Sequence, residues 1–131
     1  MQYMSFVKMT GDGGEPPKEL QDAMGEEIER GFADGTLVHI GGLYATSYRT
    51  EFRVRAGQVT STDGPFSEAK EEVGGFAIID VRDHAEAVEN ARRLAELHHK
   101  LWPGWEGSVE VRRIAGADDI ASSGDDPAAS V

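Results

Sequence analysis

The 131-residue chain has no cysteine, which excludes disulfide bonds and thiolate zinc sites. It also has no apolar run as long as a membrane span requires. Its first six residues, Met1 to Phe6, contain no basic segment, long apolar core or cleavage site, so they do not predict a secretory signal. Together these absences predict a cytoplasmic protein without a membrane partner.

Positive charge is scarce. The chain has 13 lysine and arginine residues against 24 acidic ones, which gives a formal net charge of −11. A surface that binds phosphate backbones needs clustered basic side chains, and surplus acid also disfavours anionic membranes. We therefore expect no nucleic-acid partner. The apolar fraction of 39% is typical of a globular protein and not of a disordered one.

The hydrophobic pattern predicts an α+β domain. Apolar alternation predicts main strands at residues 2–9, 37–43, 75–81 and 108–114, with a hairpin over residues 50–61. Four-residue spacing from Leu20 to Phe32 predicts a first helix that ends at Gly35. A second helix is expected after Asp83, which forms a capping-box pattern with Glu86. Without the inserted β-hairpin the order is β-α-β-β-α-β, the ferredoxin-like arrangement with both helices on one sheet face.

The strands at residues 2–9 and 75–81 are apolar on both faces, so the sheet face opposite the helices also needs cover. A second copy of the chain is the simplest cover, and we therefore expect a homodimer. Residues 117–131 consist mainly of Asp, Ala, Ser and Gly without a period. They predict an acidic disordered tail after a folded domain of residues 1–116.

Two neighbouring segments resemble the signature of the DGPF-type family of YCII-related proteins. They are Thr62-Asp63-Gly64-Pro65-Phe66-Ser67-Glu68-Ala69-Lys70-Glu71 and Gly74-Gly75-Phe76. Glu110-Val111-Arg112 is similar to the closing segment of that family, so the resemblance spans roughly Met1 to Ile114. It implies a dimeric α+β barrel, in which two ferredoxin-like sheets pack face to face. It implies little about activity, because most members have no established reaction and a fold does not supply one.

Some YCII-like enzymes act on lactones through a His–Asp pair, and this chain departs from their pattern. The predicted first helix has no histidine, and the region where the resemblance places the Asp has His98-His99-Lys100 instead. That pair is therefore not carried over to this sequence.

Asp63 and His98 are the candidate catalytic residues. Asp63 is either a general base in a rigid Gly-Pro turn or an Asx turn that caps its own backbone. His98 lies on the apolar stripe of the second helix, so it is either a hydrogen-bonded core histidine or a general acid/base beside a carboxylate. A right-handed crossover would bring the end of that helix to the sheet edge where Asp63 lies.

Tyr44, Phe66, Trp102 and Trp105 are the candidate ligand-binding residues, because aromatic side chains line apolar pockets. The two tryptophans have an alternative role, which is to pack the helix end or a dimer interface. Adjacent histidines on a helix point about 100° apart and do not chelate as an i, i+4 pair would, so no metal is expected. No phosphate or dinucleotide motif is present, so no cofactor is expected either.

These observations predict a protein that binds a small organic molecule between its sheet and helices. If it is an enzyme, cofactor-free acid–base chemistry of the lyase or isomerase type is the expected form. The alternative is a non-catalytic regulatory protein linked to an alternative sigma factor, which the resemblance implies because DGPF genes commonly neighbour sigma-factor genes. The sequence does not decide between them.

Overall fold

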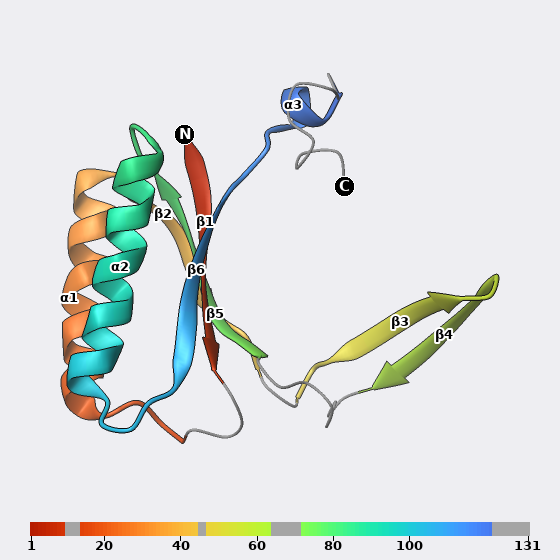
Figure 1. Cartoon of the computed structure of the whole chain (residues 1–131), viewed down its shortest axis with the longest axis horizontal. Helices are drawn as coiled ribbons and strands as arrows, with labels where there is room; N and C mark the ends of the chain where they lie inside the picture. Colours follow the sequence, from red (N-terminus) through yellow and green to blue (C-terminus); the bar gives the residue numbers. More distant parts are fainter. Residues whose placement is uncertain (10–13, 45–46, 64–71, 122–131) are drawn as a thin grey trace.

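The computed structural model describes residues 1–9, 14–44, 47–63 and 72–121 (Figure 1). Along the chain its elements are β1 (Gln2–Met9), α1 (Lys18–Asp34), β2 (Leu37–Gly42), β3 (Thr50–Arg55), β4 (Gln58–Asp63), β5 (Glu72–Asp80), α2 (His84–Leu101), β6 (Gly107–Arg113) and α3 (Ala117–Ala121). None of the helices among these residues is long and apolar enough to cross a membrane.

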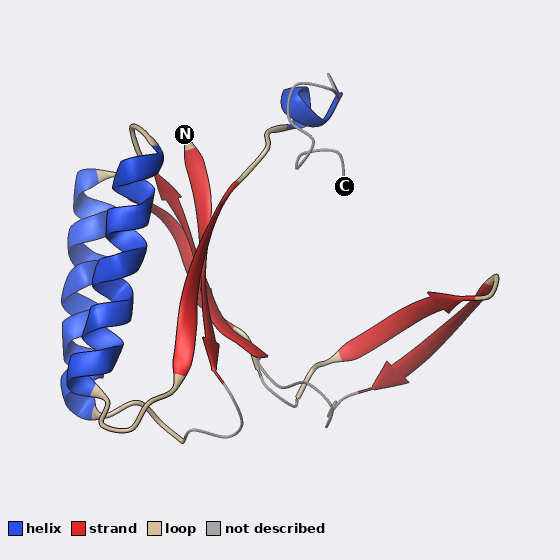
Figure 2. Ribbon diagram, in the orientation of Figure 1, coloured by secondary structure: helices blue, strands red, loops and turns tan. Residues whose placement is uncertain are grey.

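The main sheet is antiparallel and has the strand order β2-β5-β1-β6, and both long helices cover the same face of it (Figure 2). This is the ferredoxin-like order, with the β3–β4 hairpin inserted between the second and third main strands. The predicted fold class is therefore confirmed. The face-to-face dimer that would complete a barrel stays a prediction.

Capping interactions define an end of each long helix. Gly35 follows α1 in the left-handed conformation with a φ of 83°, which a residue without a Cβ adopts freely. Asp83 caps α2, and its carboxylate accepts a hydrogen bond from the Glu86 backbone N–H at 2.9 Å. These two caps fix where the helices meet the ends of the strands.

The core lies between the sheet and the two long helices, is small, and includes Leu20 of α1. Tyr3, Ile79, Val81 and Ala87 form one buried cluster. The Phe32 side chain, which the helical period places on the buried stripe of α1, is 50% exposed. The hydrophobic period of a helix shows on which face a residue lies. It does not show whether another element covers the end of the helix where Phe32 lies.

The β3–β4 hairpin, residues 50–63, is called the arm below. It projects from the body on the side of the sheet opposite the helices (Figure 1). Ala56 and Gly57 both have positive φ, 52° and 76°, as a two-residue type I′ turn requires. Every residue of both strands is exposed. Their chain neighbours 45–46 and 64–71 lie outside the described residues.

The first residues of the expected tail are helical. In α3 the Gly116 backbone N–H donates to Asp119 Oδ2 at 2.9 Å, and this side chain caps the single turn. The sequence analysis expected no regular structure there, because five residues show no apolar period. Residues 122–131 lie outside the described part of the chain, and the domain boundary at residue 116 stays a prediction.

Candidate functional site

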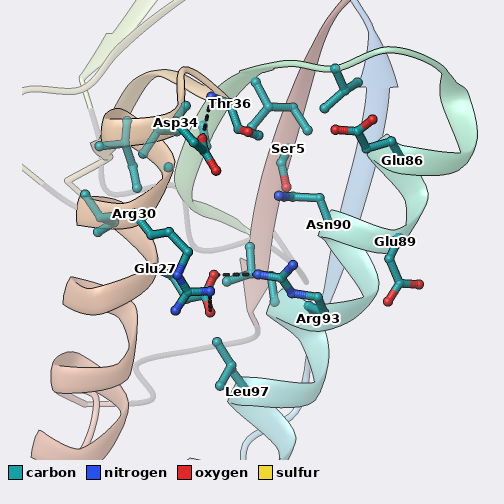
Figure 3. Close-up of a pocket in the computed structure, with 18 of the residues that line it drawn as sticks. Ser5, Glu27, Arg30, Asp34, Thr36, Glu86, Glu89, Asn90, Arg93 and Leu97 are labelled. Carbon is teal, nitrogen blue, oxygen red and sulfur yellow. Dashed lines mark hydrogen bonds and ion pairs between the residues drawn. The ribbon is translucent and has the colours of Figure 1, made fainter.

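A cavity of about 620 Å³ lies between α1, α2 and the helix-facing side of the sheet (Figure 3). This volume is within the range of about 300–1,000 Å³ that small-molecule sites occupy. Its walls are largely apolar and include Met24, Ile28, Ile40, Ile79, Leu94 and Leu97. The sequence analysis expected a pocket between sheet and helices, and the cavity lies in that layer.

Ser5 is a polar residue in this apolar surrounding. Its side chain is 2% exposed, and its hydroxyl has no hydrogen-bond partner within the described part of the chain. It comes from the middle of β1, paired with Ala77 of β5, and lines the cavity together with Asn90 of α2 (Figure 3). A buried hydroxyl without a partner costs about 1–3 kcal/mol, so Ser5 offers an unused hydrogen bond inside the cavity.

An ion pair joins the two helices across the cavity. Arg93 of α2 donates to Glu27 Oε2 of α1 at 2.6 Å, and Arg30 donates to the other carboxylate oxygen at 3.1 Å (Figure 3). The Glu27 side chain is 33% exposed and the arginines are more exposed, so solvent screens the pair. The ion pair therefore adds little to the free energy of unfolding, and its main effect is to position α1 against α2 at the cavity.

Acidic side chains outnumber basic ones around the cavity. The carboxylates that line it belong to Glu27, Asp34, Asp83, Glu86 and Glu89. The lining arginines are Arg30, Arg82 and Arg93. The hydrogen bond from the Thr36 backbone N–H lowers the pKa of Asp34, and the hydrogen bond from Arg92 lowers the pKa of Glu89. Both carboxylates are therefore charged at neutral pH, and the cavity surface is net acidic.

His98 is buried, 6% exposed, and takes part in packing at the C-terminal end of α2. Its Nδ1 lies 2.9 Å from the carbonyl oxygen of Leu94, and its ring centroid lies 4.8 Å from that of Trp105. Because a carbonyl only accepts, Nδ1 carries the hydrogen. Trp102 lies beside Trp105 at 6.3 Å. These three side chains form an aromatic cluster that does not line the cavity.

Tyr44 lies at the base of the arm, 72% exposed. It lines a separate hollow of about 470 Å³ together with Tyr48, Arg49 and Glu72. Arg49 donates to Glu72 at 2.6 Å there. Phe66, the other aromatic candidate, lies outside the described residues.

Asp63 is the last residue of β4, and the rest of the turn expected at residues 63–66 lies outside the described residues. It pairs across the arm with Thr50, whose hydroxyl donates to Asp63 Oδ1 at 2.7 Å. This cross-strand pairing extends the strand to Asp63. Within the described residues, neither Asp63 nor His98 lines the large cavity, and their hydrogen-bond partners differ: Thr50 for Asp63 and the Leu94 carbonyl for His98. Among the described residues no group of three or more His, Asp or Glu side chains is placed to hold a metal ion.

The family model for the YCII-related domain matches residues 1–118. The chain belongs to the YCII-related family. It is also similar to the uncharacterized protein R00369 of Rhizobium meliloti (strain 1021), 34% identical over 89 residues, which are 67% of this chain and 68% of that protein. The YCII-related assignment agrees with the α+β fold and names no reaction, so function has to be argued from the site.

Sequence reasoning about this YCII-related chain missed Ser5, Asn90, Glu27 and Arg93. Ser5 gave a usable signal, because a serine between Met4 and Phe6 is a polar residue in a strand that is otherwise apolar. The other three are ordinary polar residues of amphipathic helices. Only the packing of α1 against α2 shows that they lie at a cavity.

Proposed function

We propose that this YCII-related protein binds a small organic molecule in the cavity between the sheet, α1 and α2. The observation that supports the proposal is the Ser5 hydroxyl, buried and without a partner in the described chain, at the wall of a cavity of about 620 Å³ that apolar and charged side chains line. Natural cores rarely retain such a group without a role, since an alanine there would avoid the cost of desolvation.

The cavity favours a neutral ligand with an apolar body and one hydrogen-bonding group. The apolar walls reward burial of hydrocarbon, and Ser5 and Asn90 supply neutral donors and acceptors. A carboxylate or phosphate would meet a net acidic lining whose arginines Arg93 and Arg30 already pair with Glu27. The expected ligands are therefore amides, ketones, phenols or lactones rather than anions.

A ligand screen tests this directly. Neutral amides, ketones, phenols and lactones are compared with size-matched carboxylates by thermal shift, and hits are quantified by calorimetry. Ser5→Ala is expected to weaken binding of a hit by about tenfold, the equivalent of one hydrogen bond. The same variant should leave the unliganded protein equally stable or more stable, because it removes an unsatisfied hydroxyl.

The matched control is Ser108→Ala, a serine in β6 on the opposite face of the same sheet. It should leave affinity unchanged, whereas Ala77→Leu should abolish binding by filling the cavity beside Ser5. The proposal is wrong if Ala77→Leu binds every hit as well as the native chain does. Preferential binding of carboxylates would refute the ligand class.

Catalysis by Asp63 and His98 stays a prediction, since within the described residues each of the two side chains has a different hydrogen-bond partner. The link to an alternative sigma factor also stays a prediction.

We further propose that the protein is a homodimer through the sheet face away from the helices. Tyr3 and Ile79 point to the core, so their neighbours Met4 and Ile78, which pair across β1 and β5, point the other way. Phe6 and Phe76 form the next pair on that face. These large apolar side chains are partly exposed in one chain, and their burial by a second sheet would supply an apolar interface.

Light scattering tests the dimer. The native chain should remain dimeric at micromolar concentration, because apolar interfaces of this type usually bury more than about 2,000 Å². Phe6→Glu, which places a charge at the centre of that face, should give a monomer with native helix content. A native chain that is monomeric at that concentration refutes this proposal and leaves the cavity proposal standing.

A further inference from the structure

The arm has one apolar and one charged face. The cross-strand pairs Phe52↔Ser61 and Val54↔Val59 place the three large apolar side chains of the arm on the same side. Phe52 is 70% exposed, Val54 73% and Val59 67%. The other face carries charged and polar groups that include Glu51, Arg53 and Arg55. This is the pattern of a strand pair that is covered on one side.

Nothing in the described chain covers that side. The two strands of the arm pair only with each other. A lone two-stranded hairpin is at best marginally stable in water, and it needs a third strand or a packing surface. The missing surface therefore has to come from a second molecule or from the chain's own body.

Two contacts lie next to the base of the arm. Arg49, just before β3, forms an ion pair at 2.6 Å with Glu72, the first residue of β5, and both side chains are about three-quarters buried. Tyr44 and Tyr48 meet edge to face at 5.4 Å on the approach to the arm. From there the arm extends beyond the open side of the sheet (Figure 1).

We propose that the arm packs its apolar face, Phe52, Val54 and Val59, on a second copy of this chain. This inference rests on the proposed homodimer, because a chain seated on the open sheet face lies on the side toward which the arm extends. Two-fold symmetry would then let each arm cover part of the other chain. The arm itself has two arginines against two acids, so it carries no net charge that a chain with 24 acidic against 13 basic residues would repel.

Hydrogen exchange on the full native chain tests the proposal. The chain is measured at one concentration where light scattering shows dimer and at another where dilution has produced monomer. The amides of β3 and β4 should exchange at least tenfold more slowly in the dimer, and this protection should disappear in the monomer. Strands β1 and β5 serve as internal references for the integrity of the body.

Three outcomes would overturn the proposal. Rapid exchange of the arm in an intact dimer would mean that the arm does not dock, while the dimer itself stands. Protection that persists in the diluted monomer would mean that the arm folds onto its own chain. A chain that is monomeric throughout, with a freely exchanging arm, would remove both the dimer and the docking surface.

A pair of variants adds a second readout. Phe52→Ser combined with Val54→Ser removes most of the apolar face and should weaken dimerisation at least tenfold, with loss of arm protection. The control Arg53→Ser combined with Arg55→Ser changes the same strand on its charged face and should shift the dissociation constant by less than threefold. Equal effects of both pairs, or no effect of the first pair, would overturn the assignment of the docking face.

Discussion

Replacement of His98 by alanine separates a packing role from a chemical one. The imidazole is 6% exposed, its Nδ1–H donates to the Leu94 carbonyl at 2.9 Å, and its ring lies 4.8 Å from that of Trp105. A net hydrogen bond is worth about 1 kcal/mol, and an aromatic pair about 0.5–1.5 kcal/mol beyond its buried area. With the cavity that the ring leaves behind, His98→Ala should cost about 2–3 kcal/mol of unfolding free energy.

The assay is urea unfolding followed by the fluorescence of Trp102 and Trp105, which lie beside His98. At about 4 °C per kcal/mol for a chain of this size, the melting temperature should fall by about 10 °C at equal protein concentration. His99→Ala is the matched control. It removes the exposed neighbouring imidazole from the same helix and should change stability by less than about 0.5 kcal/mol.

Binding in the cavity should be unchanged in His98→Ala well below its melting temperature, because His98 does not line that cavity. Asp63→Asn should change neither stability nor binding, since Asp63 is exposed and an amide oxygen still accepts from Thr50. The reasoning is refuted if His98→Ala keeps native stability and loses ligand binding or turnover about 100-fold. It is refuted equally if Asp63→Asn produces the same loss, because the two residues would then act as a pair.

Further predictions concern three glycine or alanine positions and the C-terminal segment. Gly107→Ala should destabilise the protein by more than about 2 kcal/mol in urea unfolding, because an added Cβ would overlap the Lys8 carbonyl oxygen and the Trp105 ring. Gly25→Ala should instead stabilise the protein by about 0.5–1 kcal/mol, because Gly25 is exposed on α1 and an added Cβ there would meet open space. Ala56→Asn should slow hydrogen exchange of the arm, because asparagine tolerates the φ of 52° better than alanine does. A chain that ends at Gly116 should unfold within about 0.5 kcal/mol of the full chain, and a larger loss would show that residues 117–131 dock.

The sequence by itself determined the order of the six strands and the two long helices, although not α3. Gly35 and Asp83 mark helix ends through the conformation or hydrogen bond of a single residue, so their effect is visible without knowledge of the rest of the chain. The two-residue turn at Ala56-Gly57 is local in the same sense. Apolar residues on both faces of β1 and β5 likewise predicted a central position in the sheet, and the strand order agrees.

Only the tertiary structure decided which side chains meet. The cavity combines Ser5 of β1, Glu27 of α1 and Arg93 of α2, three residues whose sequence neighbours give no sign of that meeting. Asp63 and His98 illustrate the converse. A right-handed crossover predicted that they would lie at one sheet edge, but Asp63 pairs with Thr50 in the arm, and His98 contacts the Leu94 carbonyl and the Trp105 ring. The hydrophobic period of a segment shows on which face of its helix or strand a residue lies. A binding site depends on how the faces of distant segments pack together, and that packing is determined by the whole core.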